Sequence, residues 1–199
     1  MKLEDVEEIV VNSTYQLSVK RLTPTARIPT KAYSSDAGWD VYSDEDVTIY
    51  PGETKKINTN ICLQLPQILH SSFETISILV WDRGSVGAAG IHRTAGVSDF
   101  GYNSNLFICL TNLNVLPLIR AAAESFVKSL HFSNTDDAFF ENNRIDIFER
   151  VLEENAYHIK QGDKIAQILI QKIIKLNPIE VNELVKTDRG SRCLGSSGR

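Results

Sequence analysis

The 199-residue sequence has few cysteines, no long apolar run and no excess of positive charge. Its three cysteines, Cys62, Cys109 and Cys193, form no CxxC pair and match no zinc-ligand spacing, which indicates reduced thiols. The N-terminus MKLEDVEEIV is acidic where a secretory signal is basic and then apolar. No segment reaches the roughly 20 apolar residues that span a bilayer, and a net charge of -4 argues against a nonspecific nucleic-acid binder. We therefore expect an intracellular protein, cytoplasmic or nuclear rather than secreted, that binds neither membrane nor nucleic acid.

Short apolar runs separated by turn residues make up most of the chain and predict a mainly β protein in one domain, residues 1–199. The alternation in VTIY and the Pro51-Gly52 turn favour strands over helix. Many short strands at close spacing are typical of a sandwich or barrel. The predicted strands cover residues 17–22, 39–43, 47–53, 55–65, 76–81, 105–112 and 163–173.

Residues 116–155 break this pattern and predict a helical insertion between two strands. Leu118, Ile119, Ala122 and Phe126 have helical spacing after Pro117, which predicts one long helix. Further along, Ile145, Phe148, Val151 and Leu152 share one face and predict a shorter helix. Typical connections have about 4–6 residues, so this insertion is large. Its apolar face must be covered, either by the β-domain of the same chain or by a protein partner.

Four stretches combine glycine with charged or hydroxyl side chains: residues 34–40, 82–90, 95–102 and the tail at 189–199. Glycine lets backbone N–H groups approach anionic oxygens, and arginine adds a forked positive charge. Taken singly, such stretches are more often simple turns, and a Ser/Gly/Arg tail is more often a flexible end (here residues 187–199). Their order along the chain is more informative than any one of them.

That order resembles the five motifs of the trimeric dUTP diphosphatase (dUTPase) family. Residues 37–40 (AGWD) resemble its AGxD, residues 83–91 its PRSG with a following Gly-Ile, and residues 96–102 (GVSDFGY) its GVIDxDY. Residues 162–167 (GDKIAQ) are similar to its GDRIAQ, and residues 189–198 to its RGxGGFGSTG. The resemblance implies the family's distorted jelly-roll (β-clip) fold and a homotrimer whose tail reaches another chain's site.

The resemblance also implies Mg2+-dependent hydrolysis of dUTP to dUMP and pyrophosphate. Asp99 is implied as the general base that activates water for attack on the α-phosphate. Asp40 is implied to contact the metal, mostly through water, and Tyr102 to pack under the deoxyribose. A hairpin at about residues 90–97 is implied to recognise uracil through its backbone. The implied substrate-binding residues are Arg83, Gly84, Ser85, Gly96, Val97, Tyr102, Gln167, Arg189, Leu194, Gly195, Ser196 and Ser197.

The sequence departs from the family pattern at three sites, and two other functions stay open. Asn103-Ser104 replaces the Arg-Gly that usually follows the tyrosine. Gly84-Ser85 reverses the family's Ser-Gly order, and Leu194 stands where the family has a phenylalanine that stacks on the base. One alternative is a regulatory or binding protein of this fold with weakened catalysis. The other is an enzyme related to dCTP deaminase, but residues 103–112 contain no carboxylate of the kind that those enzymes use.

Overall fold

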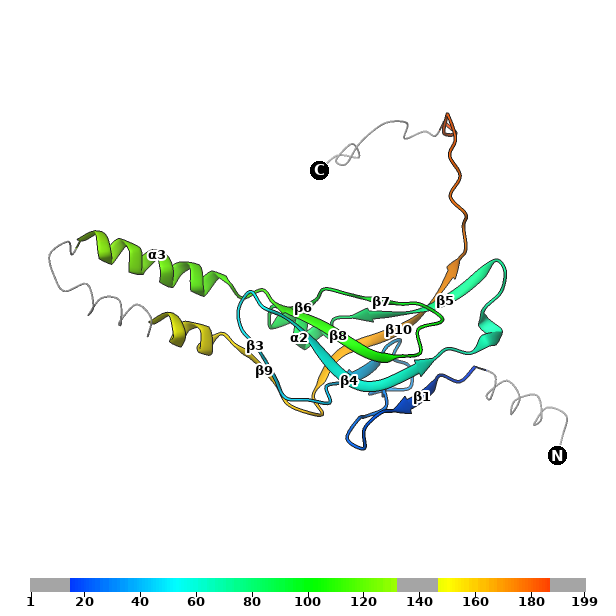
Figure 1. Cartoon of the computed structure of the whole chain (residues 1–199), viewed down its shortest axis with the longest axis horizontal. Coiled ribbons are helices and arrows are strands. Elements are labelled where there is room, and N and C mark those ends of the chain that lie inside the picture. The colour runs from blue at the N-terminus through cyan, green and yellow to red at the C-terminus, as the bar shows by residue number, and fades with distance from the viewer. Residues whose placement is uncertain (1–14, 132–146, 187–199) are drawn as a thin grey trace.

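The computed structural model describes residues 15–131 and 147–186, which form a β body with a helical projection (Figure 1). Two 4-stranded antiparallel sheets and a 2-stranded ribbon make up the body. The strands are β1 (Ser18–Arg21), β2 (Trp39–Tyr42), β3 (Val47–Ile49), β4 (Thr54–Gln64), β5 (Glu74–Trp81), β6 (Ile91–Arg93), β7 (Val97–Ser98), β8 (Asn105–Asn112), β9 (Tyr157–Ile159) and β10 (Lys164–Ile174).

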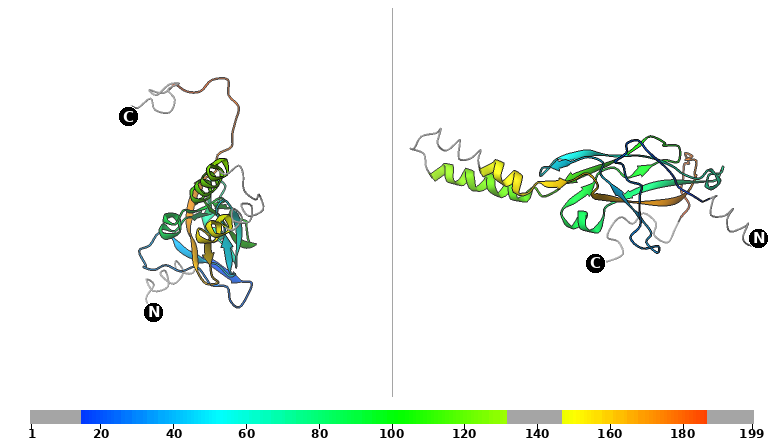
Figure 2. Two further views of the ribbon diagram at one scale, coloured as in Figure 1. Left: turned by 90° about the vertical axis from the view of Figure 1, so that its left-hand side faces the viewer. Right: turned by 90° about the horizontal axis from the view of Figure 1, so that it is seen from below.

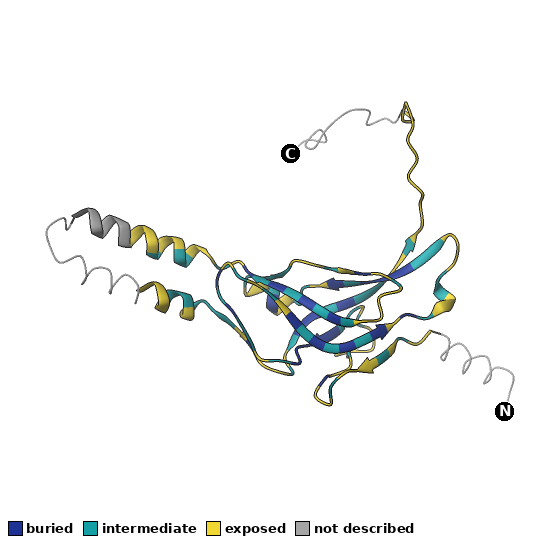
Figure 3. Cartoon of the chain, in the orientation of Figure 1, coloured by how far each residue is buried: buried dark blue, intermediate teal, exposed yellow. Residues whose placement is uncertain are grey.

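The two sheets enclose the core in the manner of a jelly roll. The first has the order β1-β4-β8-β6 and the second β2-β10-β5-β7, so neighbours in space are mostly distant in sequence. Burial alternates along β4 and β8, because successive side chains of a strand point to opposite faces. Figure 3 shows these strands banded between buried and less buried residues. The fully buried side chains include Val41, Ile49, Ile57, Ile61, Ile78, Ile91, Ile108, Leu110, Ile165 and Ile168.

Within residues 15–131 and 147–186, helix is confined to η1 (Gln67–Leu69), α2 (Gly84–Ala88), α3 (Leu116–His131) and residues 147–154. The last two lie side by side and project away from the β body, and we call them the helical finger (Figures 1 and 2). Leu116 and Ile119 are 53% and 59% exposed, so the β body does not cover them. A protein partner on the finger stays a prediction. No helix within 15–131 and 147–186 is long and apolar enough to span a bilayer.

One buried amide side chain joins the two segments of the chain at the base of the helical finger. Asn112, at the end of β8, is fully buried. Its Nδ2 donates to the carbonyl oxygens of Ile49 (2.9 Å) and Asn155 (3.0 Å), and its Oδ1 accepts from the N–H of Asn114 (3.0 Å). The chain therefore leaves and re-enters the β body at neighbouring points, which makes the finger separable from the core.

Replacing residues 116–154 with a six-residue Gly/Ser linker should leave the β body folded. We expect the helical signal in circular dichroism to fall and the unfolding midpoint to stay within about 5 °C of the parent, a shift worth roughly 1 kcal/mol. Adding Asn112→Leu to the shortened chain should lower the midpoint further, because buried carbonyls lose their donor. Loss of cooperative unfolding in the shortened chain alone would show that the finger is part of the core.

Candidate functional site

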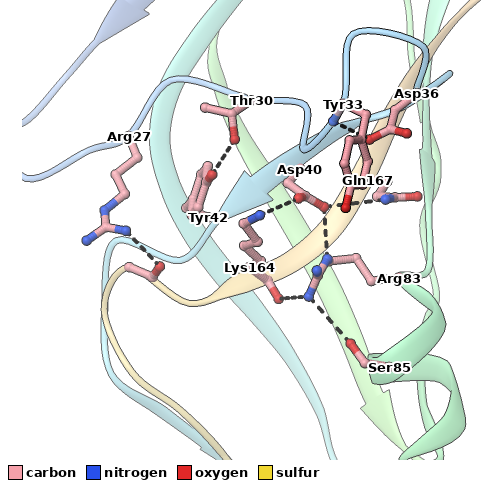
Figure 4. Close-up of polar contacts among 11 residues, drawn as sticks. Arg27, Thr30, Tyr33, Asp36, Asp40, Tyr42, Arg83, Ser85, Lys164 and Gln167 are labelled. Carbon is pink, nitrogen blue, oxygen red and sulfur yellow. Dashed lines mark hydrogen bonds and ion pairs between the residues drawn. The ribbon is translucent and has the colours of Figure 1, made fainter.

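Asp40 is a buried carboxylate that two cations share. Its side chain is 6% exposed, and Arg83 Nε lies 2.8 Å from Oδ1 while Lys164 Nζ lies 2.7 Å from Oδ2 (Figure 4). Gln167 Nε2 donates to Oδ1 at 3.4 Å. Arg83 follows β5, Asp40 belongs to β2, and Lys164 and Gln167 belong to β10, so three segments meet at this carboxylate. We call these four residues the Asp40 cluster.

The Asp40 cluster is charged and leaves a net positive charge at the surface. Burial raises the pKa of Asp40, but the hydrogen bonds from Lys164 and Arg83 outweigh it and hold the pKa below its usual range. The carboxylate in turn raises the pKa of Lys164. Arg83 and Lys164 stay cationic beside one anion, so the cluster can attract an anionic group such as phosphate. Lys164 was not among the site residues predicted from the sequence.

Residues 84–88 form the short helix α2, which corrects the glycine-rich loop expected there. Ser85 Oγ accepts from Arg83 Nη1 at 3.4 Å, so this hydroxyl faces the Asp40 cluster. A Cβ built on Gly84 meets nothing within 4 Å, so Gly84 borders open space. Of the two, the Ser85 hydroxyl is therefore the one beside Arg83.

A second cluster surrounds the turn after β7. Asp99 is exposed, and its carbonyl oxygen accepts from the N–H of Tyr102 at 3.0 Å. The Tyr102 hydroxyl donates to the carbonyl oxygen of Asn105 at 2.9 Å, which fixes its ring against the turn. Phe100 stacks on His70 with ring centroids 4.3 Å apart. The turn is thus held on both sides while the Asp99 carboxylate faces solvent.

A cavity of about 240 Å³ opens beside Asp99, between the edges of the two sheets. This is less than the roughly 300–1,000 Å³ of typical small-molecule sites, which suits a group the size of one ring. The second sheet and its turn contribute residues that the sequence had indicated, whereas the β8 residues were missed. The lining is Val80, Ala95, Gly96, Val97, Ser98, Asp99, Tyr102, Leu106, Phe107 and Cys109.

The segment from Gly90 to Val97 is a crossover between the sheets, which corrects the expected hairpin. β6 pairs with β8 and β7 pairs with β5, so these two strands do not pair with one another. The Arg93 guanidinium lies over the Trp81 ring at 4.7 Å. A Cβ on Gly96 would come within 2.3 Å of Arg93 Nη1, so glycine is needed for this close packing.

The Asp40 cluster and the Asp99 cavity are far apart in one chain. In the second sheet, β10 and β5 separate β2 from β7, with Gln167 paired to both Asp40 and Trp81. Ser98, next to Asp99, pairs with Ile78, three residues along β5 from Trp81. Three strand spacings across and about four residues along amount to roughly 15–20 Å. One chain therefore does not bring these two groups together.

Five of the predicted site residues, Arg189, Leu194, Gly195, Ser196 and Ser197, lie outside the described residues. Residues 175–186, which precede them, run away from the β body as an extended segment that we call the arm (Figure 1). Its apolar side chains face solvent: Leu176, Ile179, Leu184 and Val185 are 80–91% exposed. Such a run of exposed apolar side chains is unusual on the surface of a single chain.

Comparison with known proteins identifies similar chains along nearly the whole sequence. The dUTPase family model matches residues 25–118 and 136–198. A deoxyuridine 5'-triphosphate nucleotidohydrolase of Clostridioides difficile is 30% identical over 184 residues, which cover 92% of this chain and 99% of that protein. One from Clostridium tetani is 28% identical over 185 residues, 93% and 98% of the two chains.

Solved structures share the fold. A mutant dUTPase of Staphylococcus bacteriophage 80alpha with dUpNHpp has a TM-score of 0.66 at 24% identity and covers 92% of this chain and 99% of its own. A mutant dUTPase of phage phi11 of S. aureus, described with a structural Mg(II) ion, has a TM-score of 0.60 at 23% identity, with coverages of 84% and 97%.

Asp40→Asn should change how stability depends on pH. Because the folded-state pKa of Asp40 is lowered, its stabilising contribution is present above the usual value of 3.8 and is lost as pH falls through the folded-state pKa. At pH 7 we expect the variant to be less stable by about 1–3 kcal/mol, the worth of hydrogen bonds to a charged group. The difference should shrink toward pH 3.

Urea unfolding at fixed protein concentration measures this difference in stability, with exposed Glu124→Gln as the control. A difference that is constant with pH would contradict the assignment.

Proposed function

The chain belongs to the dUTPase family, and from this premise we propose that it hydrolyses dUTP to dUMP and pyrophosphate. The observation that carries the proposal is the exposed Asp99 carboxylate at a cavity large enough for one ring. Asp99 is exposed on a turn that Tyr102 holds, so its carboxylate can face a bound nucleotide. The measurement that tests the proposal is pyrophosphate release from each deoxynucleoside triphosphate by the purified protein.

In the proposed reaction Asp99 acts as general base. Its carboxylate takes a proton from a water molecule as the water oxygen attacks the α-phosphorus in line with the leaving group. The bond from the α-phosphorus to the oxygen that bridges to the β-phosphate breaks, and its electron pair leaves with pyrophosphate. The α-phosphate remains on the nucleoside as dUMP. Asp99 then returns the proton to solvent.

The remaining residues would bind and orient the substrate. Tyr102 would pack its ring under the deoxyribose, where a 2′-hydroxyl would clash, and Gly96 and Val97 would present backbone groups to uracil. Arg83, Ser85 and Gln167 would contact phosphate oxygens, with the backbone of Gly84 beside them. This division follows the two clusters, since the cavity is largely apolar and the Asp40 cluster is cationic. The tail residues Arg189, Leu194, Gly195, Ser196 and Ser197 would close over the base and the outer phosphates.

The residues fit Mg2+ only as an ion carried by the phosphates. The described residues contain no group of three His, Cys, Asp or Glu side chains that could hold a metal. Both oxygens of Asp40 are engaged by cations, so Asp40 would reach the ion through water at most. Mg2+ is commonly bound by substrate phosphates with few protein ligands. When bound, it would neutralise charge that develops on the triphosphate.

We propose further that the active site is shared between subunits of a homotrimer. A triphosphate cannot reach both Asp99 and the Asp40 cluster of one chain, because they lie roughly 15–20 Å apart by strand spacing. A site that uses both must take them from different chains. The arm supports this arrangement, since its exposed apolar residues would be covered on a neighbouring subunit and would carry the tail there.

Asp99→Asn should bind nucleotide but turn it over slowly. Loss of the general base should lower kcat by roughly 10²–10⁴-fold. Affinity for dUpNHpp, measured by calorimetry, should change little, because the Asp99 side chain is exposed and its backbone bond to Tyr102 remains. Exposed Glu149→Gln on the finger serves as the matched control. Near-parental kcat in Asp99→Asn would remove Asp99 from the reaction.

Mixed assemblies should test the shared site. Asp99→Asn and Arg83→Gln chains, each inactive alone, should regain about a quarter of parental activity when co-assembled at equal ratio, since that fraction of shared sites is intact. Mixing Asp99→Asn with the Asp99→Asn/Arg83→Gln double variant should recover nothing. If native mass spectrometry shows mixed trimers and no activity returns, both residues act within one chain.

A further inference from the structure

Lys164 pairs with the buried Asp40 carboxylate, and the proposed reaction gives it no role. It is the first residue of β10, directly after the turn at Gly162, whose φ of +90 favours glycine. Its Nζ lies 2.7 Å from Asp40 Oδ2, and its side chain is 36% exposed against 6% for that of Asp40 (Figure 4). It is therefore the more solvent-accessible partner of a buried anion.

A bulge brings Lys164 and Gln167 to the same carboxylate. In a regular strand, residues three apart point to opposite faces of the sheet. The pairing of β10 with β2 shifts between Lys164 and Ala166, so that Lys164 pairs with Tyr42 while Gln167 pairs with Asp40. The extra residue reorients the start of the strand, as bulges near functional sites do. Both side chains then reach Asp40.

Lys164 also holds Arg83 through its own backbone. Arg83 Nη1 donates to the Lys164 carbonyl oxygen at 3.4 Å, while Arg83 Nε donates to Asp40 Oδ1 at 2.8 Å. The guanidinium is thus fixed from two directions by the β10 and β2 strands. The backbone contact survives any substitution of the Lys164 side chain, so a side-chain variant isolates the ammonium.

The contribution of the Lys164 ammonium follows from the net charge of the Asp40 cluster. Arg83 and Asp40 alone would form a neutral pair, which has little attraction for a polyanion. With Lys164 bound to the second carboxylate oxygen, the cluster has a net charge of +1 while Arg83 stays in place. Gln167 adds no charge.

We propose that Lys164 is a positioning residue of the phosphate site, which neutralises Asp40 so that the charge of Arg83 remains available to the triphosphate. This rests on the proposed dUTP hydrolysis. Lys164 acts through Asp40 and Arg83 and does not itself contact the nucleotide. The substrate class that depends on it is the nucleoside triphosphate, whose negative charge the cluster attracts.

Lys164→Met should raise KM for dUTP by roughly 10–100-fold, the range expected when a hydrogen bond to a charged group is lost. We expect kcat to stay within about threefold, because ground state and transition state lose the same phosphate interaction. Lys164→Arg should restore KM to within about threefold. Lys172→Met, which removes an exposed lysine from the same strand and its pair with Glu74, is the matched control.

The Asp40→Asn background separates positioning from direct contact. If Lys164 acts through Asp40, Lys164→Met should add less than about threefold to KM in that background, because the two substitutions remove one interaction. A rise in KM of roughly 10–100-fold in that background would instead mean that Lys164 contacts the phosphates, and it would overturn the proposal. So would an unchanged KM in folded Lys164→Met. Should Lys164→Met not fold, the Lys164→Arg and double-variant comparisons still decide. If the parent protein itself fails to hydrolyse dUTP, the proposed function fails, which is a separate result.

Discussion

The ion pairs of Asp40 join the parts of the chain from which the candidate phosphate site is built. β2 supplies the carboxylate, the segment after β5 supplies Arg83, and β10 supplies Lys164. A carboxylate that is 6% exposed is stable in charged form only if its partners stay in place. The pairing of this charge therefore links the start of β10 and the segment before α2 to β2. A substitution that moves one of these three segments therefore also disturbs the contacts of the other two.

The second constraint is distance. A sheet places residues at fixed intervals, so the pairing of β2, β10, β5 and β7 separates the Asp40 cluster from Asp99. Trp81 lies on β5, one of the two strands between them, and the guanidinium of Arg93 from β6 covers its ring. The Asp40 cluster is cationic, whereas the cavity beside Asp99 is largely apolar. In the proposed homotrimer these two parts would form one site only on association, which would couple catalysis to assembly.

The sequence was most informative where a pattern extends over many residues. Apolar runs between turn residues predicted the long strands β4, β5, β8 and β10, and helical spacing predicted a helix from Leu116, where α3 begins. β6, β7 and β9 have only two or three residues, too few for any periodicity to register. The glycine content of residues 84–88 concealed α2, because glycine lowers helix propensity whether or not the surroundings impose a helix.

Among site residues, the motifs indicated neighbours on one turn or helix start, and they also indicated Asp40 and Gln167, which meet only through the pairing of β2 and β10. Asp99 and Tyr102 meet on one turn, and Arg83 and Ser85 meet across the start of α2. Lys164, Phe107 and Cys109 were missed, because their roles depend on pairing between distant strands. The alternation of NLFICLTN does place Phe107 and Cys109 on one face, but which face meets the cavity follows only from the register. The crossover at residues 90–97 was mistaken for a hairpin for the same reason.

The hydrogen bond from Asn112 to Asn155 has a consequence for how such a chain can vary. It joins the two ends of the segment that contains the helical finger. The entropic cost of closing this segment is therefore set at one point, at the edge of the β body. That cost grows only with the logarithm of the length enclosed, and each doubling adds about 0.6 kcal/mol. The enclosed stretch can therefore be lengthened, shortened or exchanged at little cost in folding free energy, while Asn112 and Asn155 keep its two ends together.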